Sequence, residues 1–350
     1  MIINREVLLN ALRTVKPGLS TKEIIQQAMH VMFMGEYVAT FNDVISVLCP
    51  FKTDFKCSVN GEEFYKILEG IKEDEVEVDV DKDHIVVNSV KTKAGFSTLV
   101  GEQEKVDVMV EKLLEITSKP KFFRSLPKDF IKGMSLCMYN ADKDMTKGIN
   151  RCVAVRENEV FSTDSLRISR YIMDNKVRDE LLINGRDVFD LVKYDVVRYG
   201  LSSGWVHFQT DDGVIFNCKT MKGEYPYKRV SIWCKVPEPK IEMPPELQDA
   251  MRNAAVLATG EVDISKQVEV TIKKNTIICK SEKERGWMVK EIDCSYKGKE
   301  LTFKINPIFF AQVLESATSL SLTQGGEYPD KAYLSNENFT HIIALPTPDR

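Results

Sequence analysis

The sequence lacks long apolar runs and any recognisable leader. Its longest apolar stretches, such as residues 31–33 and 342–345, fall far short of the roughly 20 residues that a transmembrane helix needs. The first six residues, Met-Ile-Ile-Asn-Arg-Glu, do not have the basic and then apolar layout of a signal peptide. We therefore expect a cytoplasmic protein with no membrane partner.

The sequence also lacks the common signatures of metal and cofactor chemistry. None of its eight cysteines forms a Cys-x-x-Cys pair, and most lie in apolar, strand-like runs, which favours buried free thiols. The four histidines, His30, His84, His207 and His341, are dispersed. The chain has no phosphate-binding loop, no Gly-x-Gly-x-x-Gly and no His-Glu-x-x-His. These absences predict a protein that is not an enzyme, with no catalytic residue, no metal and no cofactor.

The charge balance argues against indiscriminate binding to nucleic acid. The 350 residues carry a net charge of −4, with 43% hydrophobic and 29% charged residues. A tight duplex-binding protein is usually basic, so any DNA contact has to be weak and local. The acidic residues 73–81 alternate with valines, which favours a strand with one wet face over a cation site. The length predicts two or three domains, because single cores stop growing at roughly 250–300 residues.

An internal repeat organises the chain. Segments that begin at Asn60, Asn184 and Asn306 carry apolar residues at positions +4, +7 and +8 from the asparagine. Those offsets put Phe64, Ile67 and Leu68 on one face of a helix. The asparagines are 184 − 60 = 124 and 306 − 184 = 122 residues apart. Asn is a favourable N-cap, so we expect three equivalent helices that begin at these residues.

Each repeat is predicted to open with another amphipathic helix. These helices cover residues 5–16, 127–139 and 245–258, and the first has Val7, Leu8, Ala11, Leu12 and Val15 inward. Alternating or short apolar runs follow, at residues 29–33, 76–80, 85–87, 205–208, 268–272 and 342–345, and they predict strands. The proline-rich residues 236–245 suit a connector. We predict three α+β domains, at residues 1–115, 122–235 and 241–350.

This arrangement resembles the β sliding clamp of bacterial DNA polymerase III, over nearly the whole chain. The resemblance is carried by Leu-Pro-Lys-Asp-Phe at residues 126–130, Ser-Thr-Asp at 162–164, Gly-Glu-Tyr-Pro-Tyr at 223–227 and Tyr-Lys-Gly-Lys-Glu-Leu at 296–301. Repeat three adds Arg-Asn-Ala-Ala-Val-Leu-Ala at 252–258, and the chain end has Leu-Pro-Thr at 345–347. The chain departs from the family at Ser165, where a glycine is expected, which suits a divergent phage or plasmid version.

The resemblance implies a processivity factor and the partners of one. Clamps of this family are built from repeated domains, each with two helices and antiparallel sheets, and six such domains close a ring. Three domains per chain then imply a homodimer that encircles double-stranded DNA without regard to sequence. DNA polymerase and the clamp loader would bind as partners through short peptides. The alternative is an interaction scaffold that keeps the clamp fold but does not encircle DNA.

Three sets of site residues follow from the resemblance. The predicted DNA-facing cations are Arg5, Arg13, Lys16, Lys22, Lys66, Lys128, Lys132, Lys143, Arg186, Lys193 and Arg252. The predicted peptide pocket, between domains 2 and 3, consists of Ile149, Thr163, Ser165, Ile168, Ile232, Ile343, Leu345 and Pro346. The predicted dimer interface pairs Phe96 and Leu99 on one protomer with Val256 and Leu257 on the other. For any one of the cations, an ordinary solvated surface charge is an equally good interpretation, and for the aliphatic pocket residues so is core packing.

Overall fold

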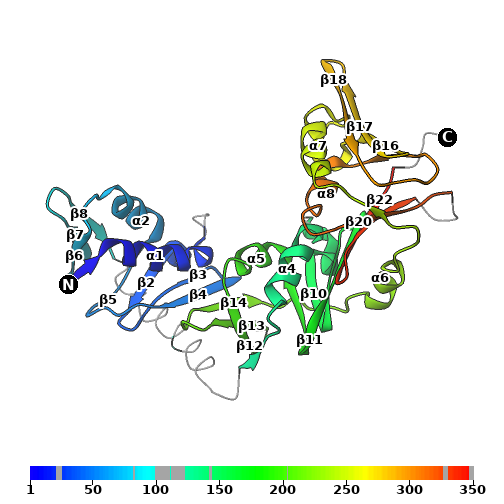
Figure 1. Ribbon diagram of the computed structural model, residues 1–350. Coiled ribbons are helices and arrows are strands. Elements are labelled where there is room, and N and C mark those ends of the chain that lie inside the picture. The colour runs from blue at the N-terminus through cyan, green and yellow to red at the C-terminus, as the bar shows by residue number, and fades with distance from the viewer. Residues whose placement is uncertain are drawn as a thin grey trace. The chain divides into compact units, whose positions relative to one another are not determined.

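The structure is a computed structural model that describes residues 1–20, 26–81, 83–98, 111, 123–141, 144–202, 204–325 and 330–346. The chain divides into two compact units (Figure 1). Unit 1 consists of residues 1–128 and 190–221, and unit 2 consists of residues 129–189 and 222–350. Each unit is described by itself below.

Unit 1 contains two antiparallel sheets. The four-stranded sheet has the order β1 (Ile2–Asn4), β6 (Glu75–Val80), β7 (His84–Asn88) and β8 (Lys93–Ser97). The eight-stranded sheet has the order β5 (Lys56–Asn60), β2 (His30–Met34), β3 (Tyr37–Phe41), β4 (Ile45–Pro50), β14 (Ile215–Lys219), β13 (Trp205–Thr210), β12 (Val196–Ser202) and β9 (Arg124–Ser125). Strands β4 and β14 pair from Ile45↔Cys218 to Leu48↔Ile215. Strands from the first and second predicted repeats therefore share one sheet, and the three domain boundaries stay a prediction.

Two helices, α1 (Arg5–Val15) and α2 (Gly61–Gly70), pack against the sheets of unit 1. The Asn60 side chain accepts hydrogen bonds from the backbone N–H groups of Glu62 and Glu63, which confirms the predicted N-cap. Leu8, Ala11, Leu12, Val15, Phe64 and Leu68 are buried as predicted. Val7 and Ile67 were wrongly placed inward. They are 56% and 39% exposed, because the buried stripe of each helix is narrower than the apolar pattern.

Unit 2 also contains two antiparallel sheets. The six-stranded sheet has the order β10 (Cys152–Thr163), β11 (Arg167–Asn184), β22 (Phe339–Ala344), β21 (Lys331–Ser335), β20 (Ser319–Thr323) and β15 (Ile241–Glu242). The four-stranded sheet has the order β18 (Gly286–Asp293), β17 (Thr276–Lys283), β16 (Val268–Lys273) and β19 (Leu301–Ile305). Strand β11 pairs with β22 from Arg167↔Ile343 to Tyr171↔Phe339. Segments far apart in the sequence thus meet at the β11–β22 junction.

The helices of unit 2 are short. They are α4 (Phe130–Cys137), α6 (Tyr227–Trp233), α7 (Glu246–Ala254) and α8 (Pro307–Ala311), while α5 (Gly185–Leu191) joins the sequence ranges of the two units. Single 3-10 turns continue two of these helices, η3 (Met138–Asn140) after α4 and η5 (Ala255–Leu257) after α7. Asn306 caps α8 through Ile308 N–H and Phe309 N–H. The predicted third helix nevertheless ends at Ala311, so Val313 and Leu314 are buried in the turns that follow.

The mixed helix and antiparallel-sheet class is confirmed, and the strands predicted from alternation are present. Six of the eight cysteines are buried and two are half-buried, all as free thiols. Burial raises the pKa of Cys49 to about 11 and that of Cys57 to about 12. Within the described residues, no helix is long and apolar enough to cross a membrane.

Candidate functional site

A tight turn between β10 and β11 forms one corner of the strongest candidate site. The Asp164 carboxylate accepts hydrogen bonds from the backbone N–H groups of Leu166, at 3.1 Å, and Arg167, at 2.7 Å. The Thr163 hydroxyl donates to the Arg167 carbonyl at 2.8 Å. Ser165 has a φ of +74°, the left-handed conformation that favours glycine. The turn that the resemblance assigns to glycine is therefore kept with a serine.

Arg167 fastens this turn to the neighbouring elements. Its guanidinium is almost fully buried and forms an ion pair with Asp164 at 2.7 Å. It also donates to the Gln312 side chain at 2.8 Å and to the Tyr139 carbonyl at 2.9 Å. The guanidinium carbon lies 3.7 Å from the centre of the Phe309 ring. A charge buried this deeply is stable only because its donors are paired.

A cavity of about 380 Å³ opens beside the turn, in unit 2. Its lining residues come from the β10–β11 turn, from α6 and from strands β21 and β22. They are Asn150, Thr163, Ser165, Leu166, Arg167, Ile168, Pro226, Arg229, Val230, Trp233, Lys331, Ile342 and Ala344. The Lys331 ammonium lies 4.3 Å from the centre of the Trp233 ring. The cavity lining thus combines apolar side chains with an aromatic ring and cations, a composition suited to an extended peptide.

Three of the eight predicted pocket residues, Thr163, Ser165 and Ile168, line this cavity. The remaining five, Ile149, Ile232, Ile343, Leu345 and Pro346, are not among its lining residues. Strand alternation explains Ile343, which is buried and points to the opposite face of β22 from Ile342 and Ala344. Ile232 is 73% exposed on α6, whereas Val230 and Trp233 of that helix line the cavity.

The sequence analysis missed ten of the thirteen lining residues, among them Arg229, Val230, Trp233, Lys331 and Ile342. The period of two in residues 342–344 could have selected Ile342 in place of Ile343. Lys331 had no such signal, because only the pairing of β21 with β22 brings it to the cavity. Tertiary pairing, and not local pattern, completes this site.

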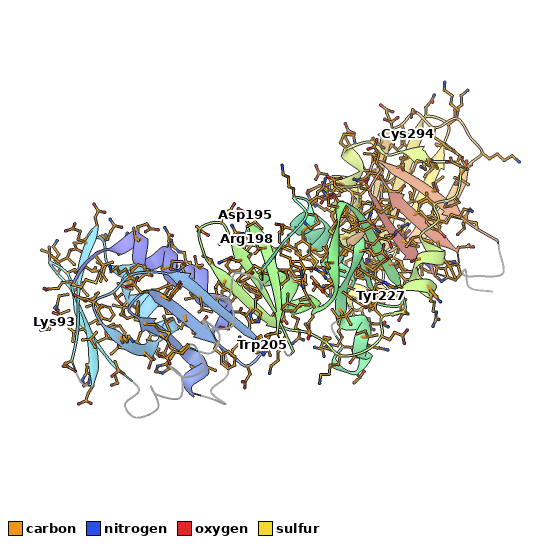
Figure 2. The ribbon with its side chains drawn as sticks, turned by 90° about the horizontal axis from the view of Figure 1, so that it is seen from below. Lys93, Asp195, Arg198, Trp205, Tyr227 and Cys294 are labelled. Carbon is orange, nitrogen blue, oxygen red and sulfur yellow. The ribbon has the colours of Figure 1, made fainter. Side chains whose placement is uncertain are left out.

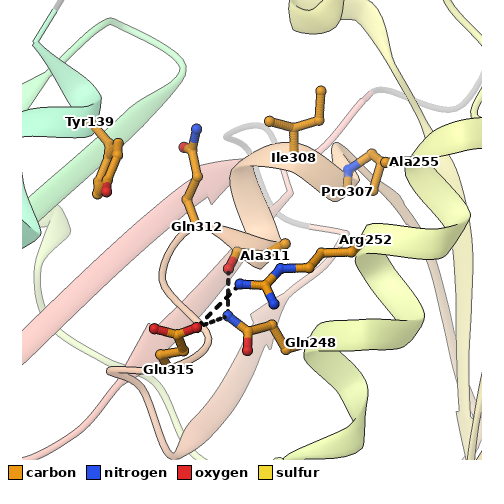
Figure 3. A pocket seen from close by; sticks show the side chains of 9 residues that line it. All are labelled: Tyr139, Gln248, Arg252, Ala255, Pro307, Ile308, Ala311, Gln312 and Glu315. Atoms are coloured by element: carbon orange, nitrogen blue, oxygen red, sulfur yellow. Dashed lines mark hydrogen bonds and ion pairs between the residues drawn. The ribbon is translucent and has the colours of Figure 1, made fainter. Parts of the chain in front are cut away.

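A second cavity, of about 400 Å³, lies between α7 and α8 (Figure 3). Glu315 is the hub of its polar side. Its carboxylate accepts from the Gln248 amide at 3.0 Å and forms an ion pair with Arg252 at 3.2 Å. The Gln248 amide also donates to the Ala311 carbonyl at 3.3 Å. Figure 3 shows these contacts crossing from α7 to Ala311 of α8 and to Glu315 in the segment that follows, with Tyr139 on the other side of the cavity.

The predicted DNA-facing cations fall into two groups. Five of the nine that the structure describes have a carboxylate within 4 Å: Arg5 and Arg13 with Glu6, Lys66 with Glu62, Lys193 with Asp190, and Arg252 with Glu315 and Asp249. Lys16, Lys128, Lys132 and Arg186 are exposed and have no such partner among the described residues. Lys128 was predicted to lie on the helix over residues 127–139, but α4 begins at Phe130 and Lys128 lies in the turn before it. Lys22 and Lys143 lie outside the described residues.

The predicted interface residues lie near strands at the edges of two sheets. Strand β8 is at one edge of the four-stranded sheet of unit 1, with Lys93 near its start (Figure 2). Phe96 of β8 is half-buried, with its ring centre 5.3 Å from that of Phe64. In unit 2, η5 contacts the edge strand β18, and its Val256 is 74% exposed beside the half-buried Leu257. Leu99 lies outside the described residues.

Two further apolar side chains on β18 were missed. Trp287 and Val289 are 70% and 46% exposed. Their period of two along an edge strand is the signal that could have found them. Exposed apolar groups on a free strand edge invite pairing with another chain.

Comparison with known proteins identifies the fold. No protein-family model matches the chain, and no curated protein sequence matches it. Among solved structures, the β subunit of DNA polymerase from Streptococcus pyogenes is similar at 17% identity and a TM-score of 0.78, over 99% of both chains. The β chain of DNA polymerase III from Streptococcus pneumoniae is similar at 18% identity and a TM-score of 0.78, again over 99% of both chains. The DNA polymerase sliding clamp from Bacillus subtilis is similar at 17% identity and a TM-score of 0.75, also over 99% of both chains.

These similarities define an α+β protein built on a replication-clamp architecture. More specifically, the chain has the fold of the bacterial sliding clamp, the β subunit of DNA polymerase III. At this level of identity the likeness establishes the fold alone.

Proposed function

We propose that this protein is a sliding clamp that encircles duplex DNA and tethers a DNA polymerase, and that it has no catalytic activity of its own. The single observation that carries the proposal is the structural match over 99% of both chains to proteins described as DNA polymerase β subunits or sliding clamps. A match of that extent means that nearly the whole of the given chain takes part in the likeness. The proposed partners are double-stranded DNA, a polymerase, a clamp loader and a second copy of the chain.

The proposed ring is a homodimer that closes through the edges of two sheets. Strand β8 of one protomer would meet β18 of its partner, and the same contact would recur once around a two-fold axis, so that the assembly closes. Trp287 and Val289 join Val256, Leu257, Phe96 and Leu99 in the proposed interface. The exposure of Val256, Trp287 and Val289 in the single chain supports this assignment, because pairing would cover both these apolar groups and the edges of the sheets at β8 and β18.

The charge distribution supports sliding over tight binding. A chain with a net charge of −4 has little overall attraction for DNA, while exposed cations such as Lys132 and Arg186 supply a local one. Contacts with phosphates carry no sequence information, so the ring would bind all sequences alike. Topology, and not affinity, would then keep the protein on DNA.

The cavity beside the Thr163–Arg167 turn is the proposed docking site for peptides of the polymerase and the loader. Its apolar lining residues, including Ile168, Val230 and Ile342, can accept one or two apolar side chains. Each buried anchor is worth roughly 1.5–3 kcal/mol before ordering costs. That range favours a weak, exchangeable interaction, which a protein shared by loader and polymerase requires.

Retention on circular DNA tests the proposal. The protein is diluted until the dimer dissociates and is then concentrated with a circular plasmid, so that rings close around DNA without a loader. We expect the protein to comigrate with the circle in gel filtration at moderate salt and to be released when a restriction enzyme linearises the plasmid. Retention on linear DNA with free ends would indicate direct binding. An intact dimer that never stays on the circle would favour the scaffold alternative.

A further inference from the structure

The cavity between α7 and α8 combines an aromatic ring with a lining that has no net charge (Figure 3). Its volume of about 400 Å³ is within the range of small-ligand pockets, roughly 300–1,000 Å³. Among the described residues that line it, only Arg252 and Glu315 are charged, and they form an ion pair at 3.2 Å. A charged ligand would find no unpaired counter-charge in this lining. The cavity therefore favours a neutral group that is polar at its edge.

Two glutamine side chains present polar atoms of opposite kind to the cavity. The Gln248 amide nitrogen donates to the Ala311 carbonyl at 3.3 Å and to Glu315 at 3.0 Å, so its oxygen is the atom left to accept. The Gln312 oxygen accepts from Arg167 at 2.8 Å, so its nitrogen is the atom left to donate. Neither amide can be flipped without losing a hydrogen bond, because each partner fits only one orientation. The two glutamines thus offer one acceptor and one donor that have no other partner among the described residues.

Tyr139 forms a fixed aromatic wall of the same cavity. Its backbone carbonyl accepts from the buried Arg167 guanidinium at 2.9 Å, and its ring meets the Phe189 ring edge to face, with 5.8 Å between the ring centres. The Tyr139 ring lies on the side of the cavity opposite Gln248 and Arg252 of α7 (Figure 3). An aromatic face held in this way is a stacking surface for a planar group that enters the cavity.

The helices that carry these two aromatic rings also carry exposed cations. Lys132 precedes Tyr139 by seven positions along α4 and η3, and Arg186 precedes Phe189 by three positions on α5, spacings that place each pair on one helix face. Both cations are exposed, with no carboxylate within 4 Å in the part of the chain that the structure describes. A strand with a charged backbone and neutral planar side groups matches this arrangement. Nucleic acid has that combination.

We propose that this cavity binds an unpaired base of single-stranded nucleic acid, which stacks on Tyr139 while its edge donates to Gln248 and accepts from Gln312. Lys132 and Arg186 receive phosphates of the same strand. Every base has both a donor and an acceptor on its Watson–Crick edge, so the site has little sequence preference. A base in a duplex is stacked and paired and cannot enter a cavity. The site is separate from the peptide cavity, and the inference goes beyond the proposed encircling of duplex DNA because it does not require a closed ring.

Binding of fluorescent oligonucleotides to the full-length protein tests the proposal. A deoxythymidine strand of about ten nucleotides, within the usual range of single-strand site sizes, is compared by anisotropy with an abasic strand of the same length. The two strands carry the same charge, so a difference in affinity comes from the bases. We expect the intact strand to bind roughly fivefold more tightly or better, the low end of the contribution of one stacked base. Equal affinities would overturn the proposal.

Variants of the protein assign the difference to residues through the ratio of the two affinities, in which a change of protein charge cancels. Tyr139→Leu removes the stacking face but keeps an apolar side chain, and it should bring the ratio close to one. Gln312→Glu keeps the acceptor for Arg167 but removes the donor, and it should lower the ratio about threefold. Lys132→Gln should weaken both strands alike. Tyr296→Leu, at another half-buried tyrosine of unit 2 that is not among the lining residues of the cavity, should change neither affinity.

Photocrosslinking of the unaltered protein gives a second measurement that does not depend on the folding of a variant. A strand that carries 5-iododeoxyuridine should attach to Tyr139, which mass spectrometry of the digested protein can detect. Attachment only at the β10–β11 turn or at α6 would place the strand in the other cavity and overturn the proposal. A ratio that Tyr139→Leu and Tyr296→Leu change equally would also overturn it. None of these outcomes bears on ring closure, which retention on the circular plasmid tests separately.

Discussion

At the scale of single residues, His341 is a titratable group whose surroundings strongly favour one protonation state. It is fully buried on β22, with Nδ1 2.8 Å from the Ser169 hydroxyl and 3.3 Å from the Asn140 amide nitrogen. Both neighbours can donate to a neutral imidazole, and neither arrangement favours a second ring proton. Burial, reinforced by the charge of Arg167, lowers the pKa of His341 to about 3.

This histidine should make folding sensitive to mild acid. In the unfolded chain its pKa is about 6.5, so below that pH the unfolded state binds a proton that the folded state does not. Stability is therefore complete above pH 6.5 and falls as the pH drops toward 3. Between pH 7.5 and 5.5 the loss from His341 is about 1.4 kcal/mol. Urea unfolding at pH 7.5 and at pH 5.5 measures this loss. Between the two pH values, His341→Gln should lose about 1.4 kcal/mol less stability than the unaltered protein does.

Two comparisons keep that measurement interpretable. His84→Gln, at an exposed histidine of β7, is the matched control for the loss of an imidazole. If His341→Gln does not fold, the imidazole resonances of His341 in the unaltered protein give a second measurement, and they should not titrate between pH 7.5 and 5. A midpoint near 6.5 would contradict the assignment.

At the scale of elements, the period of the apolar residues located strands more reliably than it located helix faces. Val76 and Val78 are buried on β6 while Glu75, Glu77 and Asp79 are exposed, as alternation predicts. On helices the same reasoning misplaced Val7 and Ile67, because a short helix on a sheet buries only a narrow stripe. Helix α8 ended after five residues, and Val313 and Leu314 are buried in the turns that follow it.

Only part of the candidate pocket could be predicted from the sequence, because the lining residues come from several elements that are far apart along the chain. Thr163, Ser165 and Ile168 belong to one local turn and strand, so a motif could select them. Arg229, Trp233 and Lys331 reach the cavity from α6 and β21, and no local pattern specifies that meeting. Register also decides the outcome, since a shift of one residue exchanges Ile342 for Ile343.

The edge strand β18 and its neighbour η5 give a prediction at this scale. Val256→Glu places a charge on a side chain that is 74% exposed, so folding should be little affected. If this patch seals the proposed ring, the buried charge should instead dissociate the dimer at micromolar concentration. Light scattering should then give a mass of about 40 kDa, that of one 39.9-kDa chain, in place of about 80 kDa. Ile232→Glu, at an equally exposed position of α6, should remain dimeric, and a dimeric Val256→Glu would move the interface elsewhere.

At the scale of the whole molecule, the proposed function depends on how the cations are distributed and not on how many there are. Lysine and arginine number 48 against 52 acidic residues. Arg252, the single cation predicted to face DNA in the third repeat, has Glu315 at 3.2 Å and Asp249 at 3.6 Å. Lys132 on α4 and Arg186 on α5 have no carboxylate within 4 Å among the described residues. The middle repeat should therefore supply more of the attraction for phosphate than the third.

Salt dependence of binding to a short duplex measures this asymmetry. Each lost phosphate contact makes the negative slope of log K against log salt shallower by about 0.9. The double variant Lys132→Gln with Arg186→Gln should therefore reduce the magnitude of the slope by about 2. Arg252→Gln should change it by less than about 0.5, because the guanidinium is already compensated. Glu315→Gln should increase the magnitude of the slope, because it removes the carboxylate that pairs with Arg252 and leaves that guanidinium able to contact a phosphate. All three effects should be the same on unrelated sequences, since phosphates carry no sequence information. If Arg252→Gln lowered the slope as much as each change in the middle repeat, the ion pair with Glu315 would not neutralise Arg252 toward DNA, and the third repeat would hold the duplex as strongly as the second.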